Sequence, residues 1–283
     1  MTATLLTGKE VADSIFKELT PLIKKLDPKL VIIQVGDDPA SESYIKQKVK
    51  SCDAVGMRHD HVHLKTDVTK EELFAVIEKL NGDPDVTGFI LQLPLPAHLA
   101  SHVPLFLRAI EPKKDVDGFT AYNIGKTLIS KEFEHLPPAT PAGIIALLEF
   151  YGYGDVTGKE VVIVNHSNVV GKPLAVMLLN RNATVTVCHA ATKDLGSHTR
   201  RADILISAVG KPKLITKDMV KPGAIVIDVG ITRTKDGLVG DCDFEAVKEV
   251  ASAITPVPGG VGPLTVASLI RNTVRAKQRQ LES

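Results

Sequence analysis

Tyr44 and Lys48 form the first pair in the chain whose types and spacing could do chemistry. They lie four residues apart in the stretch "SYIKQKVKS", and residues four apart on a helix share a face. Cys52 would follow one turn later, which gives Lys48 an aromatic and partly apolar environment. Lys46 and Lys50 would be rotated away from that face. The spacing therefore distinguishes Lys48 from two neighbours that look like solvated charge.

A candidate phosphate-binding loop is the stretch "VVIVNHSNVVGKPL", in which a strand runs into a tight loop and then a helix. A dinucleotide pyrophosphate needs this context, but the stretch is not G-x-G-x-x-G. Asn165 stands at the first glycine position, Ser167 near the second, and Gly171 at the helix entry. Because Asn tolerates left-handed backbone angles, the turn could still form. The alternative is a plain strand-to-helix turn.

A second glycine-rich loop, "TPVPGGVGPLTVASL", precedes a helix whose expected N-cap is Thr265. Glycines leave the main chain bare, so that a flat ligand or a cofactor could approach it. An irregular connection between domains is the alternative.

The stretch "KKDVDGF" places Asp115 and Asp117 two residues apart before Gly118. The remaining ligands of a calcium loop are missing. The pattern favours a turn that aims one carboxylate into a cleft.

Three histidines, His59, His61 and His63, would share one face of a strand in "HDHVH". Imidazoles in line can bind a transition metal. No H-E-x-x-H or paired-Cys motif supports such a site. We expect a solvated face of an edge strand and no metal.

Composition narrows the class of protein. A formal net charge of +1 over 283 residues argues against a nucleic-acid or membrane-surface binder, because both need a basic field. No apolar run approaches the ~20 residues of a membrane helix, and the N-terminus does not read as a signal peptide. Cys52, Cys188 and Cys242 are scattered, which fits a reducing cytoplasm.

The elements that must position these residues alternate between strands and helices, which indicates parallel sheets in two α/β domains. The domains would join near residues 120–140, and the last helix would return to the first domain. A Thr69-x-x-Glu72 capping box begins one of the helices. Predicted strands lie within 29–35, 59–64, 86–96, 159–165, 183–189, 202–210, 223–230 and 251–258, and predicted helices within 39–56, 67–83, 101–110, 140–153, 171–181 and 265–281.

Several motifs, in order along the chain, carry a resemblance to a known family: "GDDPASESYIKQKVK", "FILQLPLP", "PKKDVDGF", "PATPAGI", "NHSNVVGKP" and "TPVPGGVGPLTV". Together they make the chain resemble the bifunctional methylenetetrahydrofolate dehydrogenase/methenyltetrahydrofolate cyclohydrolase (FolD) family over essentially its whole length. The resemblance implies oxidation of 5,10-methylenetetrahydrofolate with NAD(P), followed by hydrolysis to 10-formyltetrahydrofolate, in a cytoplasmic homodimer.

The family fold consists of two α/β domains that flank a cleft. The resemblance assigns residues 1–120 and 265–283 to a folate-binding catalytic domain, and residues 140–264 to a Rossmann-like NAD(P)-binding domain with a parallel sheet.

Site residues follow from the same motifs. The resemblance makes Lys48 the catalytic lysine and Tyr44 its partner, with Gln92 tuning the lysine and Asp117 holding the pterin. All four would also bind substrate, together with Pro258, Gly259 and Gly260. The implied cofactor-binding residues are Asn165, His166, Ser167, Asn168, Val169, Gly171, Ala190, Thr192, Ile231, Gly262 and Thr265.

The implied role of Lys48 has a physical requirement. An unperturbed lysine has a pKa of about 10.4, and lowering it to ~7–8 takes roughly 4 kcal/mol from burial and a cationic substrate. Gln92 could orient Lys48 without raising its pKa as a carboxylate would. Asp117 would suit the N–H donors of a pterin, and Tyr44 could lie against its ring system.

The chain departs from the family in places. Ala139 replaces a family cysteine, which the mechanism does not need. His166 and Ala190 stand where relatives that use NADP often carry ligands for its 2′-phosphate. No Asp or Glu ends the strand at 183–189 to bind a ribose in the NAD manner. His166, Asn168 or Lys193 could serve a 2′-phosphate, and on family grounds NADP is favoured over NAD.

Three other classes of protein are alternatives to a bifunctional enzyme. One alternative is a dehydrogenase without cyclohydrolase activity, and another is a dehydrogenase of the amino-acid or shikimate type with the same two-domain plan. A non-catalytic dinucleotide-binding protein would not need a lysine poised for proton transfer.

Overall fold

The computed structural model describes residues 3–235 and 237–282, which fold into two compact α/β units. The six-stranded unit comprises the described residues as far as Asp13, Thr127–Phe133 and Thr140–Thr265. The three-stranded unit comprises Ser14–Lys126, Glu134–Ala139 and the described residues from Val266 onward. No helix among the described residues is both long and apolar enough to span a bilayer.

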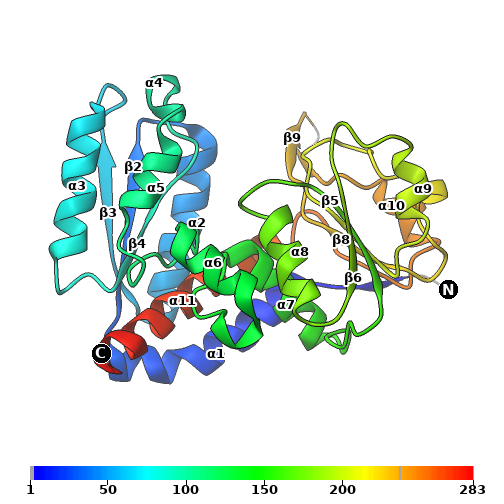
Figure 1. Cartoon of the computed structure of the whole chain (residues 1–283), viewed down its shortest axis with the longest axis horizontal. Helices are drawn as coiled ribbons and strands as arrows, with labels where there is room; N and C mark the ends of the chain where they lie inside the picture. Colours follow the sequence, from blue (N-terminus) through cyan, green and yellow to red (C-terminus); the bar gives the residue numbers. More distant parts are fainter. Residues whose placement is uncertain (1–2, 236, 283) are drawn as a thin grey trace. The chain divides into compact units, whose positions relative to one another are not determined.

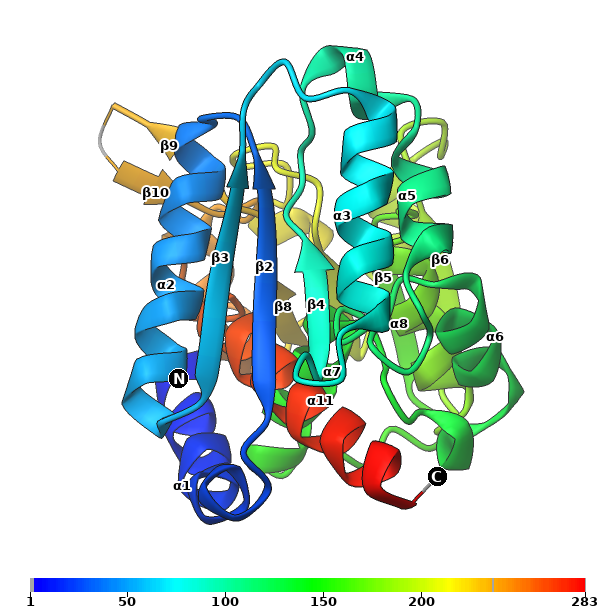
Figure 2. The ribbon, with the colours of Figure 1, turned by 90° about the vertical axis from the view of Figure 1, so that its left-hand side faces the viewer.

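The three-stranded unit is built on a parallel sheet with the order β3-β2-β4 (Figure 2). Its central strand pairs with both neighbours, so that Ile32 lies opposite His61 on one side and Ile90 on the other. The central strand is apolar because both of its faces are covered. The strands are β2 (Lys29–Val35), β3 (Arg58–Leu64) and β4 (Gly88–Leu91).

Helices cover both faces of this sheet, and Figure 1 shows α2 and α3 on opposite sides of it. One face packs with α3 and α5 around the buried rings of Phe89 and Phe106. The helices α1, α6 and α11 contribute residues to both units, and α7 (Ala139–Phe150) does so through Ala139 alone. The helices are α1 (Gly8–Leu26), α2 (Pro39–Val55), α3 (Lys70–Gly82), α4 (Ala97–Ala100), α5 (Val103–Ala109), α6 (Ala121–Ile129) and α11 (Gly262–Glu282).

Local sequence signals set the helix ends in this unit, among them the predicted capping box of α3. Asp38 caps α2 by accepting a hydrogen bond from Ser41 N at 2.7 Å, and Gly56 ends the helix with a left-handed φ of 70°. The Thr69–Glu72 capping box of α3 is present. These contacts satisfy backbone groups that a helix terminus leaves without partners.

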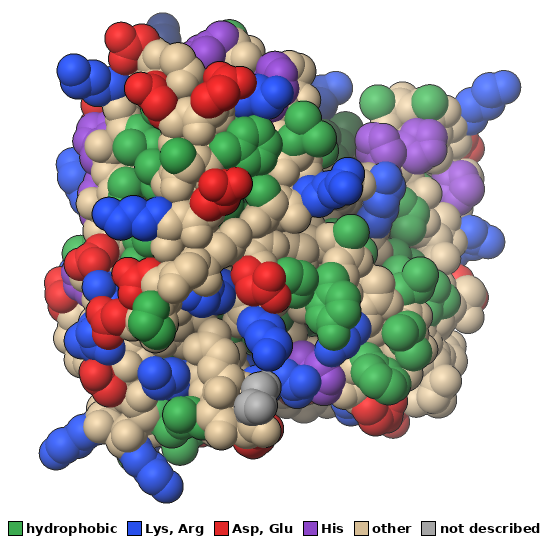
Figure 3. Space-filling view, turned by 60° about the vertical axis from the view of Figure 1, so that its left-hand side comes forward, with side chains coloured by type: hydrophobic (Ala, Val, Ile, Leu, Met, Phe, Trp, Pro, Cys, Tyr) green, Lys and Arg blue, Asp and Glu red, His purple; other side chains and the backbone are tan. Residues whose placement is uncertain are grey.

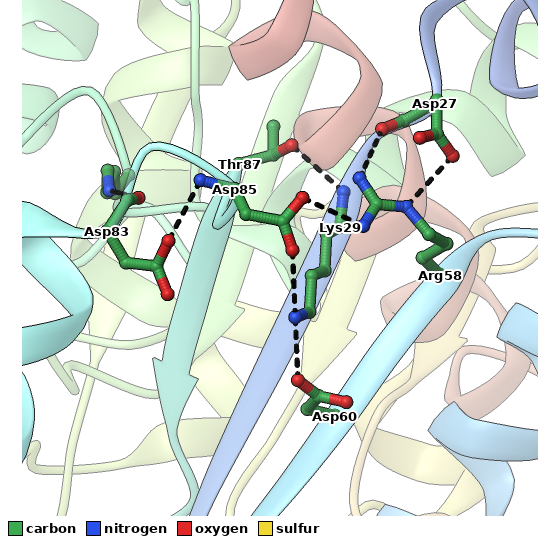
Figure 4. A network of polar contacts seen from close by, with 8 residues as sticks. Asp27, Lys29, Arg58, Asp60, Asp83, Asp85 and Thr87 are labelled. Carbon is green, nitrogen blue, oxygen red and sulfur yellow. Dashed lines mark hydrogen bonds and ion pairs between the residues drawn. The ribbon is translucent and has the colours of Figure 1, made fainter.

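An ion-pair network ties the amino ends of the strands together (Figure 4). Arg58 contacts Asp27 and Asp85 at 2.9 and 2.8 Å. Lys29 contacts Asp60 and Asp85 at 2.8 and 3.1 Å. Because most of these side chains are accessible to water, each pair contributes little to stability by itself. The network links β2 to β3 through Lys29 and Asp60, and both strands to the segment before β4 through Asp85.

The six-stranded unit contains a sheet with the order β1-β11-β8-β7-β5-β6, and its strand pairs are parallel. β1 joins this sheet because Thr4 and Leu5 pair with Ala253 and Ile254. For this reason residues 3–13 group with the six-stranded unit, whereas the sequence assigned residues 1–120 to the other domain. The strands are β1 (Thr4–Leu5), β5 (Glu160–Val164), β6 (Thr184–Cys188), β7 (Ile204–Ser207), β8 (Ile225–Asp228) and β11 (Ala253–Ile254).

The predicted strands and helices of this unit are all present, although β11 is shorter than expected. A further hairpin, β9 (Thr232–Thr234) with β10 (Gly237–Val239), was not predicted, and neither were β1, α9 (Leu195–Thr199) and α10 (Phe244–Lys248). In the three-stranded unit, α4 and most of α1 and α6 were likewise not predicted. One face of the sheet packs in a core that includes Leu205, Val226 and Val247. The remaining helices are α7 (Ala139–Phe150), α8 (Gly171–Leu179), α9 (Leu195–Thr199) and α10 (Phe244–Lys248), with 3₁₀ turns η1 (Lys131–Phe133) and η2 (Lys217–Met219).

The prediction that Thr265 caps the last helix is wrong. α11 begins at Gly262, so Thr265 lies inside its first turn. The Thr265 hydroxyl instead contacts the Thr140 hydroxyl at 3.0 Å. A side-chain contact with α7 has thus replaced the expected cap.

Candidate active site

Lys48 is a buried lysine on α2 of the three-stranded unit. Only 8% of it is exposed, and its Nζ donates a hydrogen bond to Gln92 Oε1 at 2.8 Å. Burial lowers the pKa of Lys48, against the opposing attraction of Asp117 and Cys52. Burial disfavours the ammonium form. Lys48 therefore has the environment that the sequence predicted for it.

The surroundings of Lys48 along α2 differ from one turn to the next. Tyr44, one turn before it, is 41% exposed and presents an accessible ring. Cys52, one turn after it, is fully buried, and this burial raises the pKa of its thiol to about 12. The thiol is therefore neutral at physiological pH and forms an apolar wall. Lys46 on the same helix is exposed.

Gln92 follows β4 directly, and its side chain is held in one orientation. Its backbone N–H donates to Ile33 O at 2.8 Å, which extends the pairing with β2. Its Nε2 donates to Leu93 O at 2.8 Å. Because the amide nitrogen is occupied in this way, Oε1 is the atom that faces Lys48. Gln92 therefore accepts from Lys48 without adding a charge.

Asp115 and Asp117 have different tasks in the turn after the sheet. Asp115 is 1% exposed, and its carboxylate accepts hydrogen bonds from the N–H groups of Gly118, Phe119 and Thr120 at 2.8–3.2 Å. It also accepts from Asn123 Nδ2 at 2.9 Å. Asp115 thus stabilises the turn through these hydrogen bonds. This turn holds the Asp117 carboxylate where it interacts with Lys48.

Asp117 interacts electrostatically with Lys48. Burial raises the pKa of Asp117 to about 6; Lys48 opposes this shift and Asp115 adds to it. The two groups also shift each other, since Asp117 opposes the lowering of the Lys48 pKa. A carboxyl with such a pKa changes charge close to neutral pH.

The topology of the sheet explains why these residues converge. α2 follows the carboxyl end of β2, and Gln92 follows that of β4. Asp115 forms a parallel bridge with Phe89 of β4, so Asp117 leaves the sheet at the same edge. Parallel strands collect their following loops at one edge, where α/β proteins bind ligands. The structure thus brings Tyr44, Lys48, Gln92 and Asp117 to one edge of one sheet.

The loop after β5 is organised by the side chain of Asn165. Its Oδ1 accepts from Ser167 N at 2.8 Å and from Gly171 N at 3.0 Å, and its Nδ2 donates to Ala208 O at 2.5 Å. Asn165 is not among the residues with positive φ. The expectation of a left-handed Asn was therefore wrong: the amide, rather than the backbone angle, makes the turn.

Gly171, at the start of α8, is required by close packing. A Cβ at this position would lie 2.0 Å from Asn165 O, so no side chain fits without displacing the loop. Asn165 and Gly171 thus form one tight strand-to-helix turn. The first backbone N–H groups of α8 are paired within this turn, Gly171 N with Asn165 Oδ1 and Lys172 N with Ser167 O.

The other residues of this loop mostly bind one another. Ser167 Oγ accepts from Val170 N at 3.1 Å, and Asn168 Oδ1 accepts from Lys172 Nζ at 2.8 Å. Val169 is 38% exposed. These contacts hold the loop in shape before any ligand binds.

A second loop, after β6, lies beside the first. The rings of His166 and His189 are 5.0 Å apart between centroids. Thr192 Oγ1 accepts from His189 N at 2.9 Å, and Ala190 is exposed within the turn that this bond closes. Lys193 follows, also exposed. The predicted cofactor residues of the β5 and β6 loops therefore come together at the carboxyl end of this sheet.

The glycines before α11 are needed by the backbone itself. Gly259 has a φ of +104°, and a Cβ on Gly260 would lie 2.6 Å from Pro256 O. Gly259 O also accepts from Gly8 N at 2.8 Å. Pro258 is exposed in this loop, and a Cβ on Gly262 would meet nothing within 4 Å.

Sequence reasoning missed two buried carboxylates in the six-stranded unit. Asp241 accepts from Ser207 Oγ, Val209 N and Lys211 N at 2.7–2.8 Å. Asp228 accepts from three further backbone N–H groups, and burial raises its pKa. The sequence signal was an Asp within two residues of a Gly, in "IDVG" and "VGDCD".

These two carboxylates shape the loops after β7 and β8. A Cβ on Gly230 or Gly240 would lie 2.1 Å from Asp241 Oδ1 or Asp228 Oδ2, respectively. Ile231 follows Gly230 and is 40% exposed. The carboxylates thus position the segment that carries one predicted cofactor residue.

The three histidines of β3 each have a partner within the unit. His59 contacts Asp53, His61 contacts Gln34, and His63 contacts Gly36 O, all at 2.9–3.0 Å. β3 is an edge strand, as predicted. Within residues 3–235 and 237–282, no group of three or more His, Cys, Asp or Glu side chains is placed to hold a metal.

Comparisons with known proteins give a consistent picture. Residues 6–117 match the model of the "Tetrahydrofolate dehydrogenase/cyclohydrolase, catalytic domain" family, and residues 138–281 match that of its NAD(P)-binding domain. The chain is 47% identical to the "Bifunctional protein FolD" of Brevibacillus brevis over 286 aligned positions, which cover 99% of each chain.

Solved structures agree with the sequence comparisons. The bifunctional methylenetetrahydrofolate dehydrogenase/cyclohydrolase of Campylobacter jejuni is 45% identical with a TM-score of 0.93, over 98% of this chain and 99% of that one. The corresponding Trypanosoma brucei enzyme, solved with NADP and an inhibitor, is 36% identical with a TM-score of 0.94, over 100% of both chains.

Proposed function

The chain belongs to the tetrahydrofolate dehydrogenase/cyclohydrolase family, and from this premise we propose which of its residues carry the reaction. The enzyme oxidises 5,10-methylenetetrahydrofolate to 5,10-methenyltetrahydrofolate with NADP and then hydrolyses the product to 10-formyltetrahydrofolate. A monofunctional dehydrogenase, a shikimate-type dehydrogenase and a non-catalytic binder are not favoured, since the curated relatives are bifunctional and match over the whole chain.

In this proposal Lys48 is the proton acceptor of the hydrolytic step. The observation that carries it is the buried Lys48 Nζ, 2.8 Å from the neutral Gln92 amide. Burial favours the unprotonated amine, and a methenyl cation bound nearby would favour it further. An amine in that state can take a proton from water near neutral pH.

The protons of hydrolysis balance through Lys48. Water adds to the methenyl carbon as Lys48 Nζ accepts one of its protons. The second water proton is lost when the C–N bond to the ring nitrogen breaks and the formyl group forms. One proton ends on the released nitrogen, and the other leaves to solvent, which restores the neutral lysine.

Asp117 and Tyr44 are proposed to bind the folate. An ionised Asp117 can accept hydrogen bonds from the 2-amino group and the ring N–H of a pterin. The exposed ring of Tyr44 can lie against the aromatic system of the substrate. Pro258, Gly259 and Gly260 are proposed as further substrate contacts through their backbone.

The six-stranded unit is proposed to bind NADP, which when bound accepts the hydride from the methylene carbon. The preformed Asn165 turn between β5 and α8 supports a pyrophosphate site through its strand–turn–helix context. His166, Asn168 and Lys193 are proposed to face the 2′-phosphate. Contacts elsewhere on the cofactor are proposed for Ser167, Val169, Ala190, Thr192, Ile231, Gly262 and Thr265.

The test compares two lysines of the same helix. Lys48→Met should reduce hydrolysis of methenyltetrahydrofolate by at least about 100-fold, the scale of general base catalysis. Lys46→Met is the matched control, because Lys46 is exposed, and it should stay near the wild-type rate. Absorbance of methenyltetrahydrofolate without cofactor measures the rate, and circular dichroism checks folding. A normal rate in folded Lys48→Met would remove Lys48 from the mechanism.

We also propose that the enzyme is a cytoplasmic homodimer. Cys52, Cys188 and Cys242 are buried free thiols, which supports a reducing compartment. Light scattering after size exclusion would report the mass in solution, and a mass of one chain at micromolar concentration would contradict the dimer.

A further inference from the structure

A small pocket lies in the three-stranded unit, and none of its lining residues is Tyr44, Lys48, Gln92 or Asp117. It is enclosed by α6, by the last turns of α11 and by residues 112–113 and 135–136. Its volume of about 90 Å³ has room for several water molecules or one small ion. A drug-sized ligand or a nucleotide needs a site of at least roughly 300 Å³.

The pocket is lined by cations from three different segments. Lys113, Lys126 and Arg279 contribute to its wall, and no Asp or Glu is among the described residues that line it. The formal net charge of the whole chain is only +1, so this concentration of positive charge is local. On the face in Figure 3, Lys and Arg side chains gather around a histidine in the lower middle of the view.

The aromatic residue of the pocket helps to place one of these cations. Lys126 Nζ lies 4.5 Å from the centroid of the Tyr122 ring, within the range of a cation–π contact. The Tyr122 hydroxyl lies at the outer end of that ring. Together the ammonium and the hydroxyl offer donors from one helix, and Arg279 adds positive charge from another.

The pocket contains two neutral titratable groups, the Tyr122 hydroxyl and the His135 ring, and nearby positive charges lower the pKa of each. Lys126, followed by Arg279 and Lys113, lowers the pKa of the Tyr122 hydroxyl. Burial lowers the pKa of His135 first, and Arg279, Lys126 and Arg275 lower it further. A field that disfavours a proton on His135 favours an anion beside it.

The backbone around the pocket is held in place by hydrogen bonds from buried or half-buried amides. Asn123 Nδ2 donates to Pro112 O at 3.0 Å and to Asp115 Oδ2 at 2.9 Å. Gln280 Nε2 donates to Thr87 O at 2.8 Å and to Lys113 O at 3.2 Å. A ligand would thus enter a preformed site, which reduces the entropy lost on binding.

We propose that this pocket is a second ligand site, one that binds a small multivalent oxyanion, free or as the phosphate group of a phosphorylated metabolite. Lys113, Lys126 and Arg279 supply its charge. Tyr122 supplies a neutral donor, and the ring of His135 lies in the same wall. A tetrahedral oxyanion presents several acceptors at once and so matches donors that arrive from different directions.

Isothermal titration of the full chain with sodium sulfate, at ionic strength held constant with sodium chloride, tests the proposal. The wild type should show saturable binding. A Lys126→Gln/Arg279→Gln double variant should bind at least about tenfold more weakly, which equals 1.4 kcal/mol. Lys24→Gln, an exposed lysine on α1 of the same unit, should bind like the wild type.

Two results would overturn the proposal: no saturable binding in the wild type, or an equal loss in Lys24→Gln, which would mean general charge attraction. Repeating the titration with inorganic phosphate and with glycerol 3-phosphate separates the two sources. Tighter binding of the ester indicates a phosphorylated metabolite, and equal or weaker binding indicates the free ion.

A second readout does not depend on how well a variant folds. Sulfate does not titrate near neutral pH, so any change it causes in an imidazole titration arises from its charge. Saturating sulfate should raise the pKa of His135, followed by NMR, because the anion offsets Arg279, Lys126 and Arg275. By reciprocity, sulfate should bind more tightly as the pH falls. An unchanged His135 titration would contradict the site.

Discussion

Lys48 Nζ lies 2.8 Å from Gln92 Oε1, although 44 residues separate the two along the chain. The contact joins a helix after β2 to the residue that directly follows β4. It gives a buried lysine a partner that accepts a hydrogen bond but carries no charge. This combination keeps the pKa of Lys48 low and its direction fixed, and several expected outcomes depend on it.

Replacing the neutral partner by a charged one should impair hydrolysis at neutral pH. In Gln92→Glu a carboxylate would face Lys48 and stabilise its ammonium form, which raises the lysine pKa by roughly 1–3 units. We expect the cyclohydrolase rate at pH 7 to fall at least about tenfold and to recover as the pH rises. The rate measured from pH 6 to 9.5 checks this. An unchanged pH profile would show that the charge state of residue 92 does not control Lys48.

Asp117 should make binding of the folate dependent on pH. Its pKa is raised to about 6, so the carboxylate is lost as the pH falls through that value. We expect the KM for methylenetetrahydrofolate to rise below pH 6 while the KM for NADP changes little. A flat folate KM between pH 5 and 7.5 would exclude an ionised Asp117 from the binding step.

The same shift predicts an effect on stability. A carboxyl group whose pKa is higher in the folded than in the unfolded state binds more protons when folded, so its contribution falls as the pH rises from about 4 to about 6. Asp117→Asn removes this penalty and should stabilise the protein at pH 7 by roughly 1–3 kcal/mol. Urea unfolding measures it. Asp67→Asn, an exposed aspartate of the same unit, should change stability little, and a destabilised Asp117→Asn would contradict the argument.

Asp115 should matter for stability more than for charge. Asp115→Ala would leave three backbone N–H groups without their acceptor in a buried turn and remove one of the two acceptors of Asn123 Nδ2. We expect a loss of roughly 3–5 kcal/mol in the free energy of unfolding. Asp115→Asn retains one oxygen acceptor and should lose less. Equal stability of all three proteins would show that the turn does not depend on this carboxylate.

Gly171 should separate the two activities. A Cβ in Gly171→Ala would lie 2.0 Å from Asn165 O and displace the loop after β5. The KM for NADP should rise at least about tenfold, while hydrolysis of methenyltetrahydrofolate without cofactor stays near the wild-type rate. Gly82→Ala, where the added Cβ meets nothing within 4 Å, is the control. A parallel loss of both activities would mean that the Asn165 turn also supports the hydrolytic site.

The sequence by itself determined the local structure. The spacing of Tyr44 and Lys48 placed them on one helical face, and the Thr69–Glu72 capping box fixed the start of α3. These features depend on residues within one or two turns of each other, where backbone geometry leaves few alternatives. The quoted motifs also indicated the family, because several specific stretches occurred in one order.

Tertiary structure determined which residues far apart in the sequence contact one another and which role each has. It brought Gln92 to Lys48 and placed β1 beside β11. It made Asp115 the acceptor that holds the turn, and Asp117 the carboxylate that interacts with Lys48. It also made the Asn165 amide, rather than a left-handed backbone, the centre of its loop. Such outcomes depend on which long-range hydrogen bonds form and which groups lose water. Because burial and strand pairing join segments distant along the chain, no local pattern specifies them.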